Sequence, residues 1–356
     1  MLNTFKILFM ALVFFLSLNP CSAEIIGTSS EDARWLTLES KTPNGRHIVF
    51  VTGDEEYRSE EGMPQLAHIL SKYHGFKCTV LFSINKETGF IDPEVLDNIP
   101  GLKALKTADL MVIFTRFRNL PDEQMKFIVD FVESGKPLIG LRTSTHAFDI
   151  PVDRKYHRWS WRNSQWNGGF GRQIMGETWV DHHGGHGWQS SSGIIVKEHS
   201  KHPILKGIKD GDVWDPSDVY TVNLPLPEGC VPLLNGRVLS GMDPDDGPCE
   251  IEERDGEKYD KNNPIMPVAW IRERSLSNGK KQRVFSTTLG ASQAFSREGS
   301  RRLLIQASYW CLGMEDKIDG KGKVDLVGTF RPTPFGFSRH KKEVKPADLL
   351  NVIFKD

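Results

Sequence analysis

The chain has 356 residues, 45 basic and 46 acidic, so its formal net charge is −1. Hydrophobic residues make up 38% of it, which is enough to build a core and excludes a disordered polyelectrolyte. The near-neutral balance excludes the usual argument for a nucleic-acid partner, because domains that bind nucleic acids generally carry a basic excess. We therefore expect a globular protein that binds no nucleic acid.

Residues 1–23 predict a secretory signal peptide. One basic residue, Lys6, precedes an apolar run from Ile7 to Leu18, and small residues lead up to Glu24. The run is too short to span a bilayer comfortably, so cleavage after Ala23 is favoured over an uncleaved anchor. We expect a periplasmic or secreted protein with no stable membrane span after cleavage.

Export would permit disulfide bonds, since they persist in oxidising compartments. Cys230 and Cys249 lie in loop-like sequence and form the pair that we expect to be bonded. Cys78 fits a strand pattern and Cys311 a helix pattern, so both are expected to be buried thiols.

The order of elements after a polar leader, residues 24–45, predicts the fold class. Helical spacing places one helix around residues 63–73 and another around 125–132. Between and beside them, four short apolar runs predict strands: residues 46–52, 76–82, 109–115 and 136–141. Continuous apolar strands that alternate with helices are typical of an α/β fold, a parallel sheet sandwiched by helices. Functional loops then lie at the carboxyl ends of the strands: residues 53–62, 116–120 and 142–148.

The second half of the chain continues the same domain. Residues 151–193 are rich in Trp, Gly and His, and they predict a large elaborated loop insertion. A last helix is expected near residues 303–311. Further strands are predicted at residues 193–196, 219–222, 268–272 and 283–288. We predict one domain over residues 46–314 and a C-terminal tail over residues 315–356.

Two of the predicted loops contain candidate binding or catalytic residues. Asp54 and Arg58 follow the first strand, where they can orient a polar ligand or cap the next helix. His146 follows the fourth strand and is a candidate acid, base or hydrogen-bond donor, although it can also simply hold the loop. No G-x-S-x-G elbow surrounds Ser144, and no Cys is present there.

A histidine-rich motif lies in the insertion. His182, His183 and His186 can bind zinc through neutral imidazoles, although their spacing is not that of a named zinc motif. A sugar-binding role for His182 is the alternative. Five Trp residues lie near the motif and can stack on sugar rings or pack in the core. Asp218, at the start of a predicted strand, is either a carboxylate of the same cleft or a turn residue.

Several short segments occur in an order that resembles the ThuA-like family, named for trehalose utilisation. The resemblance covers residues 46–314 and rests on these segments: the run ending at Gly53, Gly140–Phe148, Trp179–His182, Lys201–Ile204, Asp218–Tyr220, Pro267–Arg272, Arg283–Gly290 and Trp310. It implies a flavodoxin-like, class I glutamine amidotransferase-like fold. It also implies a link to disaccharide catabolism through keto-sugar intermediates.

The chain departs from the family pattern at two places. Amidotransferases of this fold use a Cys at the elbow where this chain has Arg142, so the resemblance does not extend to glutamine hydrolysis. ThuA-like proteins commonly carry a His near Arg142 and another after Gly290, where this chain has Ala291. His146 and His182 do match the pattern.

Three hypotheses follow. The first is an exported enzyme of carbohydrate metabolism, a hydrolase, lyase or isomerase, that acts on a small-molecule sugar. His146 and His182 would transfer protons or bind a metal, and the sugar would be oriented by Asp54, Arg58, Arg142 and Asp218. The second is a catalytically silent carbohydrate-binding or interaction protein of the same fold. The third is a zinc hydrolase.

Overall fold

The computed structural model describes residues 25–28, 34–254, 256–277 and 279–351. The predicted signal peptide, residues 1–23, lies outside the described residues. Within them, no helix is both long and apolar enough to cross a membrane.

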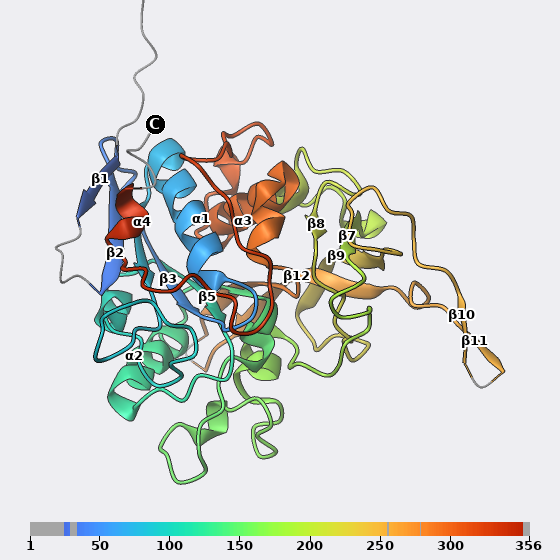
Figure 1. Ribbon diagram of the computed structural model, residues 1–356, viewed down its shortest axis with the longest axis horizontal. Helices are drawn as coiled ribbons and strands as arrows, with labels where there is room; N and C mark the ends of the chain where they lie inside the picture. Colours follow the sequence, from blue (N-terminus) through green and yellow to red (C-terminus); the bar gives the residue numbers. More distant parts are fainter. Residues whose placement is uncertain (1–24, 29–33, 255, 278, 352–356) are drawn as a thin grey trace, which may run out of the picture.

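A mixed sheet of eleven described strands organises the molecule, in the order β1-β2-β4-β3-β5-β6-β13-β12-β9-β7-β8. Its central strands pair in parallel. They are β4 (Lys77–Leu81), β3 (His47–Gly53), β5 (Leu110–Thr115), β6 (Leu138–Leu141) and β13 (Lys281–Thr287). These strands are largely buried because both faces are covered, which explains their continuous apolar sequence. The predicted α/β sandwich is confirmed (Figure 1).

Antiparallel strands extend the sheet at both edges, which the sequence did not predict as such. One edge holds β1 (Ile25–Thr28) and β2 (Trp35–Ser40), and the other holds β12 (Met266–Ser275), β9 (Cys230–Val238), β7 (Ser191–Ile195) and β8 (Trp214–Asp215). The interpretation of residues 24–45 as a polar leader is therefore wrong, because β2 pairs with β4 and buries Leu36 and Leu38. The strand predicted at residues 219–222 reduces to a single bridge between Tyr220 and His182.

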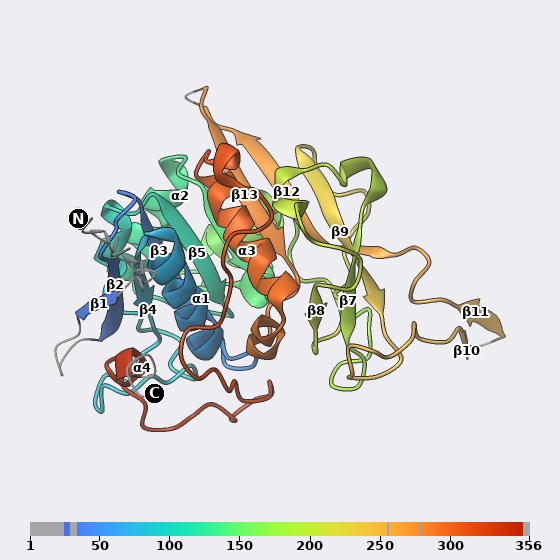
Figure 2. The ribbon, with the colours of Figure 1, turned by 90° about the horizontal axis from the view of Figure 1, so that it is seen from above.

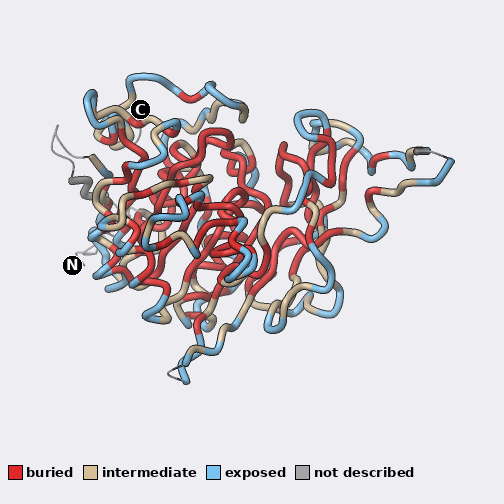
Figure 3. The backbone as a smooth tube through the Cα atoms, turned by 90° about the horizontal axis from the view of Figure 1, so that it is seen from below, coloured by how far each residue is buried: buried red, intermediate tan, exposed pale blue. Residues whose placement is uncertain are grey.

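Helices cover the two faces unequally. α1 (Ser59–His74) and α3 (Glu298–Cys311) lie side by side on one face, and α2 (Asp122–Glu133) lies on the other (Figure 2). Short helical segments fill the connections: η1 (Leu102–Lys106), η2 (Arg142–His146), η3 (His157–Trp159), η4 (Gly171–Met175), η5 (Lys197–His199), η6 (Pro203–Leu205), η7 (Ser292–Ser296), η8 (Glu315–Lys317) and α4 (Asp348–Asn351). The buried residues concentrate around the sheet, whereas the hairpin of β10 (Glu252–Arg254) and β11 (Glu257–Tyr259) projects outward (Figure 3).

Residues 315–351, predicted as a tail, pack against the domain instead. They pass beside α1 (Figure 1), where the Glu61 carboxylate accepts a 2.8 Å bond from the Thr333 amide. Val324 and Val327 of this segment are buried in the core. Between η8 and α4 the segment forms no helix or strand, and side chains of α1 and α3 hold part of its backbone: Glu61 accepts from the Thr333 amide, and Arg301 donates to the Val324 carbonyl.

Among the described residues, the cysteines Cys78, Cys230, Cys249 and Cys311 are free thiols. The expected pairing of Cys230 with Cys249 is not formed, and Cys249 instead contacts the Asn262 amide at 3.4 Å. Cys78 and Cys311 are buried, as predicted.

Candidate functional site

The candidate site lies where the carboxyl ends of β3, β5, β6 and β13 meet. The loops that follow these strands bond directly to one another: Arg116 N–H donates to Gly53 O at 2.9 Å, and Phe117 N–H to His146 O at 3.0 Å. The Thr143 hydroxyl donates to the Asp54 carboxylate. The three loops predicted to carry function therefore share one edge of the sheet, as parallel strands require.

The innermost group of the site is Arg142, whose side chain is fully buried. Its guanidinium donates to Asp218 Oδ1 at 2.8 Å, to the Tyr57 hydroxyl at 3.0 Å and to the Thr288 carbonyl at 2.8 Å. It also stacks on the Tyr220 ring, 3.7 Å from the centroid. Burial lowers the pKa of Arg142, but the electrostatic effects of Tyr220, Tyr57 and Asp218 are larger in sum and raise it. The guanidinium therefore stays positively charged.

Asp218 connects Arg142 to two histidines. Its Oδ2 accepts a 2.8 Å bond from His182 Nδ1, and its Oδ1 accepts a 3.1 Å bond from His186 Nδ1. Burial alone would raise the pKa of Asp218, but Arg142 and the two histidine bonds lower it. Because the ionised carboxylate can only accept, His182 must carry a proton on Nδ1, which leaves its Nε2 free of this bond. The His182 side chain is 37% exposed, so solvent reaches it.

His186 lies between two carboxylates. Its Nε2 is 3.1 Å from Glu56 Oε1, while its Nδ1 is bonded to Asp218. These two hydrogen bonds raise the pKa of His186 to about 9 against the opposing effect of burial. Both ring nitrogens therefore donate, and this histidine is an imidazolium at neutral pH.

His146 has the opposite electrostatic character. Burial lowers its pKa well below the ordinary value, and the positive charges of Arg116 and Arg142 lower it further. The neutral ring packs among aromatic side chains: Phe117 at 5.0 Å, Trp179 at 5.7 Å, Trp161 at 6.0 Å and Tyr220 at 6.2 Å between centroids. The Trp179 ring also lies 5.7 Å from His182, so one indole borders both histidines.

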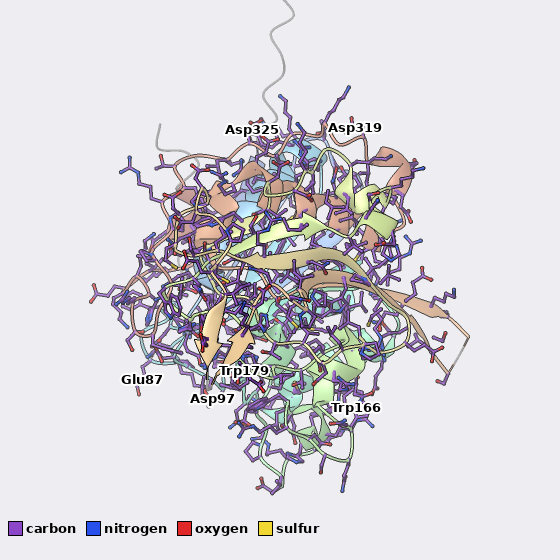
Figure 4. All side chains as sticks on the ribbon, turned by 90° about the vertical axis from the view of Figure 1, so that its right-hand side faces the viewer. Glu87, Asp97, Trp166, Trp179, Asp319 and Asp325 are labelled. Carbon is purple, nitrogen blue, oxygen red and sulfur yellow. The ribbon has the colours of Figure 1, made fainter. Side chains whose placement is uncertain are left out.

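Not all of the nearby tryptophans belong to this site. Trp179 lies near the middle of the view in Figure 4, whereas Trp166 lies toward the lower lobe. Trp166 packs against Trp159, 5.2 Å away, and Trp159 is buried in the core. The core-packing interpretation therefore holds for Trp159, and the site wall consists of Trp161 and Trp179.

Asp54 and Arg58 do not face the histidines in the way that the sequence suggested. Asp54 is buried and accepts bonds from the amides of Glu56, at 2.9 Å, and Tyr57, so it shapes the loop. Burial raises its pKa. Arg58 donates to the carbonyls of Glu55, at 3.2 Å, and Gly336, and so binds the C-terminal segment. Both residues support the site rather than line it.

Of the three histidines proposed as metal ligands, His183 points elsewhere, because its Nε2 bonds to the Lys261 carbonyl at 2.6 Å. His182 and His186 instead converge with Asp218, and one ligand atom from each lies within 4.8 Å of the others. This set of two imidazoles and one carboxylate fits the donor preferences of zinc. Asp218 thus replaces His183 in the candidate metal set.

Four contributors were not predicted as site residues: Glu56, Tyr57, Tyr220 and Phe335. Glu56 and Tyr57 lie within the loop that the sequence did single out, between the two residues chosen there. Tyr220 follows Asp218 by two positions. Phe335 lies in the supposed tail, where it stacks on Tyr57 at 5.3 Å and contacts His186 at 5.9 Å between centroids.

The sequence profile of the ThuA family, described as trehalose utilisation, matches residues 46–311. The chain belongs to the ThuA family. A ThuA-like protein from Bacteroides uniformis is similar in structure, with 14% identity, a TM-score of 0.44, and 76% of this chain and 92% of that chain covered. A ThuA-like protein from Parabacteroides merdae is also similar in structure, with 14% identity and a TM-score of 0.44; the match covers 83% of this chain and 98% of that chain. None of the curated proteins matches the chain in sequence.

The ThuA match includes Arg142, His146, His182 and Asp218, but it ends before Phe335. Arg142 and Ala291 occupy the two places where we expected a departure from the family pattern, and the structure shows what these residues do. Arg142 supplies the buried cation that holds Asp218, and the Ala291 amide donates to Asp215 Oδ2 at 3.1 Å. At position 291, the buried backbone amide therefore helps to hold the Asp215 carboxylate in place.

We predict that Arg142→Leu destabilises this ThuA chain by about 3–5 kcal/mol, because it removes the buried arginine partner of the Asp218 carboxylate and leaves His186 as its remaining cation. Urea unfolding would measure the loss. Arg158→Leu is the matched control, since Arg158 pairs with Glu133 at the surface with both side chains more than half exposed. That variant should lose about 0–1 kcal/mol. Equal losses in the two variants would contradict the central role of Arg142.

Proposed function

We propose that the histidine cluster is the active site of an exported enzyme of carbohydrate metabolism, which acts on a disaccharide or a keto-sugar derived from one. The observation that carries the proposal is the chain of contacts from Arg142 through Asp218 to the exposed His182. A carboxylate behind an imidazole fixes its tautomer and stabilises its protonated form, which is the arrangement of a general base.

The side chains near His182 suit a reaction that moves protons rather than one that forms a covalent intermediate. The thiols of Cys78 and Cys311 are buried within a strand and a helix of the core, and burial raises the pKa of both. A keto group makes the neighbouring C–H acidic, so one base and one hydrogen-bond donor suffice to shift its proton. The His182 ring can serve as that base. The His186 imidazolium can serve as that donor by exchanging its bond to Glu56 for one to the substrate.

The walls of the site suit a sugar. Trp179 is half-buried and stands beside His182, so its face can stack on the apolar C–H side of a pyranose ring. The His186 ring lies 4.6 Å from the His182 ring and pairs with Glu56, and these two polar groups can bind hydroxyl groups. This combination of an aromatic face and charged hydrogen-bonding groups supports a hydroxyl-rich substrate.

We predict that His182→Ala lowers kcat by about 10²–10⁴-fold, the usual contribution of a general base. The assay is turnover of disaccharides and of their 3-keto derivatives by the purified full chain. His146→Ala should also lower turnover, through loss of the packing around Trp179, but it should raise KM more than it lowers kcat. His199→Ala, in η5 outside the site, is the control and should retain full activity.

Unchanged rates in both the His182 and His146 variants would overturn the assignment. Binding of a disaccharide without turnover in the native chain would favour the alternative, a silent carbohydrate-binding protein. The absence of a thiol nucleophile and the departures at Arg142 and Ala291 support that alternative.

A zinc hydrolase is a second candidate, favoured by the convergence of His182, His186 and Asp218. Zinc binding requires that the His186 imidazolium lose one of its two ring protons, because only a neutral imidazole ligates, whereas His182 can ligate through Nε2 while Nδ1 stays bonded to Asp218. We predict that calorimetric titration with Zn²⁺ gives one site per chain and that His186→Ala weakens it at least tenfold, with His199→Ala unchanged. A metal-free, fully active preparation with no affinity for Zn²⁺ would remove this candidate.

Export is part of the proposal and rests on the apolar N-terminal run. We predict that the protein recovered from the periplasm or the medium of an expressing cell begins at Glu24, because cleavage follows small residues. Intact-mass measurement of the recovered chain is the check. A chain that retains residues 1–23 and stays in the membrane fraction would contradict it.

A further inference from the structure

A second cavity lies at the other end of β13 from the histidine cluster. β12 and β13 run antiparallel, and Ser275, which lines the cavity, pairs with Lys281 at the start of β13. The seven residues of β13 span about 20 Å, so the cavity is well separated from the cluster. Figure 4 accordingly shows Trp166, a wall of the cavity, apart from Trp179, which borders the cluster. The space within the cavity, with the open mouth included, is about 840 Å³, which accommodates a small organic molecule.

The charged side chains that line this cavity are two arginines and one acid, Arg158, Arg274 and Glu133. Arg158 donates to the Glu133 carboxylate at 2.9 Å, so these two charges compensate each other. Within the described residues, Arg274 has no carboxylate partner, and its one hydrogen bond goes to a neutral amide. The cavity therefore has one positive charge that the protein does not neutralise.

Arg274 is held in place by one nitrogen and keeps one edge of its guanidinium free. Its Nη1 donates to Gln282 Oε1, and the Gln282 amide nitrogen in turn donates to the carbonyls of Val132, at 3.1 Å, and Lys136, at 2.6 Å. Among the described residues, neither Nε nor Nη2 of Arg274 has a hydrogen-bond partner, and solvent reaches both nitrogens. These two donors form the edge through which a guanidinium binds a carboxylate or a phosphate with two parallel bonds.

The surroundings of Arg274 do not supply the missing negative charge. The neighbouring Arg272 donates to the carbonyls of Arg172, at 3.1 Å, and Gln173, at 3.0 Å, so it adds positive charge. Burial and the charge of Arg272 lower the pKa of Arg274 to about 10, which still leaves the guanidinium protonated at pH 7. A partly buried cation without a counter-charge costs free energy, and an anion bound at its free edge would recover part of that cost.

An aromatic side chain provides the apolar wall of the cavity. Trp166 is half-buried, and its ring packs against Trp159 with 5.2 Å between centroids. The Arg158 guanidinium lies 5.3 Å from the Trp166 centroid, and Val132 and Ile174 also line the cavity. A ring-bearing ligand can pack against such an indole, because aromatic side chains offer a large apolar surface.

We propose that this cavity binds a small organic anion, whose carboxylate or phosphate group binds the Nε–Nη2 edge of Arg274 and whose ring packs against Trp166. Either group offers two charged oxygens to that edge, whereas a neutral amide offers one uncharged oxygen and an ammonium ion is repelled. The guanidinium thus selects the charge of the ligand, and the indole selects the ring.

The acid of the cavity does not compete for this edge, because Glu133 is already paired with Arg158 at the surface. The cavity is also remote from His182 and His186, so binding there does not depend on the proposed carbohydrate chemistry. An anion bound at Arg274 would be a second ligand of this chain, recognised by residues of α2, β12 and the insertion between β6 and β7.

The test is calorimetry on the full chain at pH 7 with benzoate, phenyl phosphate, benzamide and benzylamine as matched probes. We expect the tighter of the two anions to bind about tenfold or more tightly than benzamide, the usual effect of a charge-assisted hydrogen bond, and benzylamine to bind most weakly. The order of the two anions identifies the group that the edge prefers. Arg274→Gln should reduce the affinity for that anion to the affinity for benzamide. Arg297→Gln, an exposed position at the start of α3 on the other face of the sheet, removes the same charge and should change nothing.

Three results would each overturn the proposal: equal affinities for benzamide and the tighter anion, tighter binding of benzylamine, or undiminished anion binding in Arg274→Gln. Should that variant fail to fold, Arg274→Lys provides a second one that keeps the positive charge. An ammonium group cannot make the two parallel bonds of a guanidinium, so this variant should also bind the anion more weakly. Undiminished affinity in Arg274→Lys would equally contradict the role of the Nε–Nη2 edge.

Discussion

The ion pair between Arg142 and Asp218 is the interaction on which the site depends. It is fully buried, and burying two charges is favourable only when their hydrogen bonds are nearly complete. Arg142 meets this requirement through Tyr57, Thr288 and the Asp218 carboxylate. These partners come from the loop after β3, the end of β13 and the irregular segment after β8. One guanidinium thus joins three parts of the chain that the sheet alone would not hold together.

The ion pair also explains why three histidines in one small region have different electrostatic properties. His186 is an imidazolium because Asp218 and Glu56 accept from both nitrogens, whereas His146 is neutral because it is buried near Arg116 and Arg142. A neutral imidazole that is difficult to protonate is a poor base. His182, which is partly exposed and backed by Asp218, is better suited to accept a proton. The histidine pair predicted from sequence therefore divides into His182, partly exposed and bonded to Asp218, which we propose as the base, and His146, a buried neutral ring.

Much of the fold could be predicted because short stretches of sequence are enough to identify most of its strands and helices. The four apolar runs became β3, β4, β5 and β6, since a strand covered on both faces is apolar at every position. The loops after parallel strands had to share an edge, which correctly grouped residues 53–62 with 142–148. The antiparallel edge strands were harder to predict, because β2 alternates exposed and buried residues within a polar segment.

The contacts within the site depend on tertiary structure, and no periodic pattern encodes them. His182 and Asp218 are 36 positions apart, and their bond depends on the bridge between His182 and Tyr220. The sequence supplied the right residue types in the right region but could not distinguish His183, which bonds to Lys261, from its two neighbours. Asp54 and Arg58 were misleading for the same reason, since a charged residue in a functional loop can bind backbone as readily as ligand.

The outer wall of the site comes from a segment that the ThuA match does not include. Phe335 stacks on Tyr57 and contacts His186, and Phe337, which is 51% exposed, lies beside Arg116 at 5.0 Å. Arg58 fixes this segment through the Gly336 carbonyl. The groups that we propose for the chemistry therefore belong to the region that the family profile matches, while aromatic rings beside them belong to the C-terminal segment. The Phe335 ring reaches the Arg142–Asp218 pair through Tyr57, which bonds to Arg142, and through His186, which bonds to Asp218.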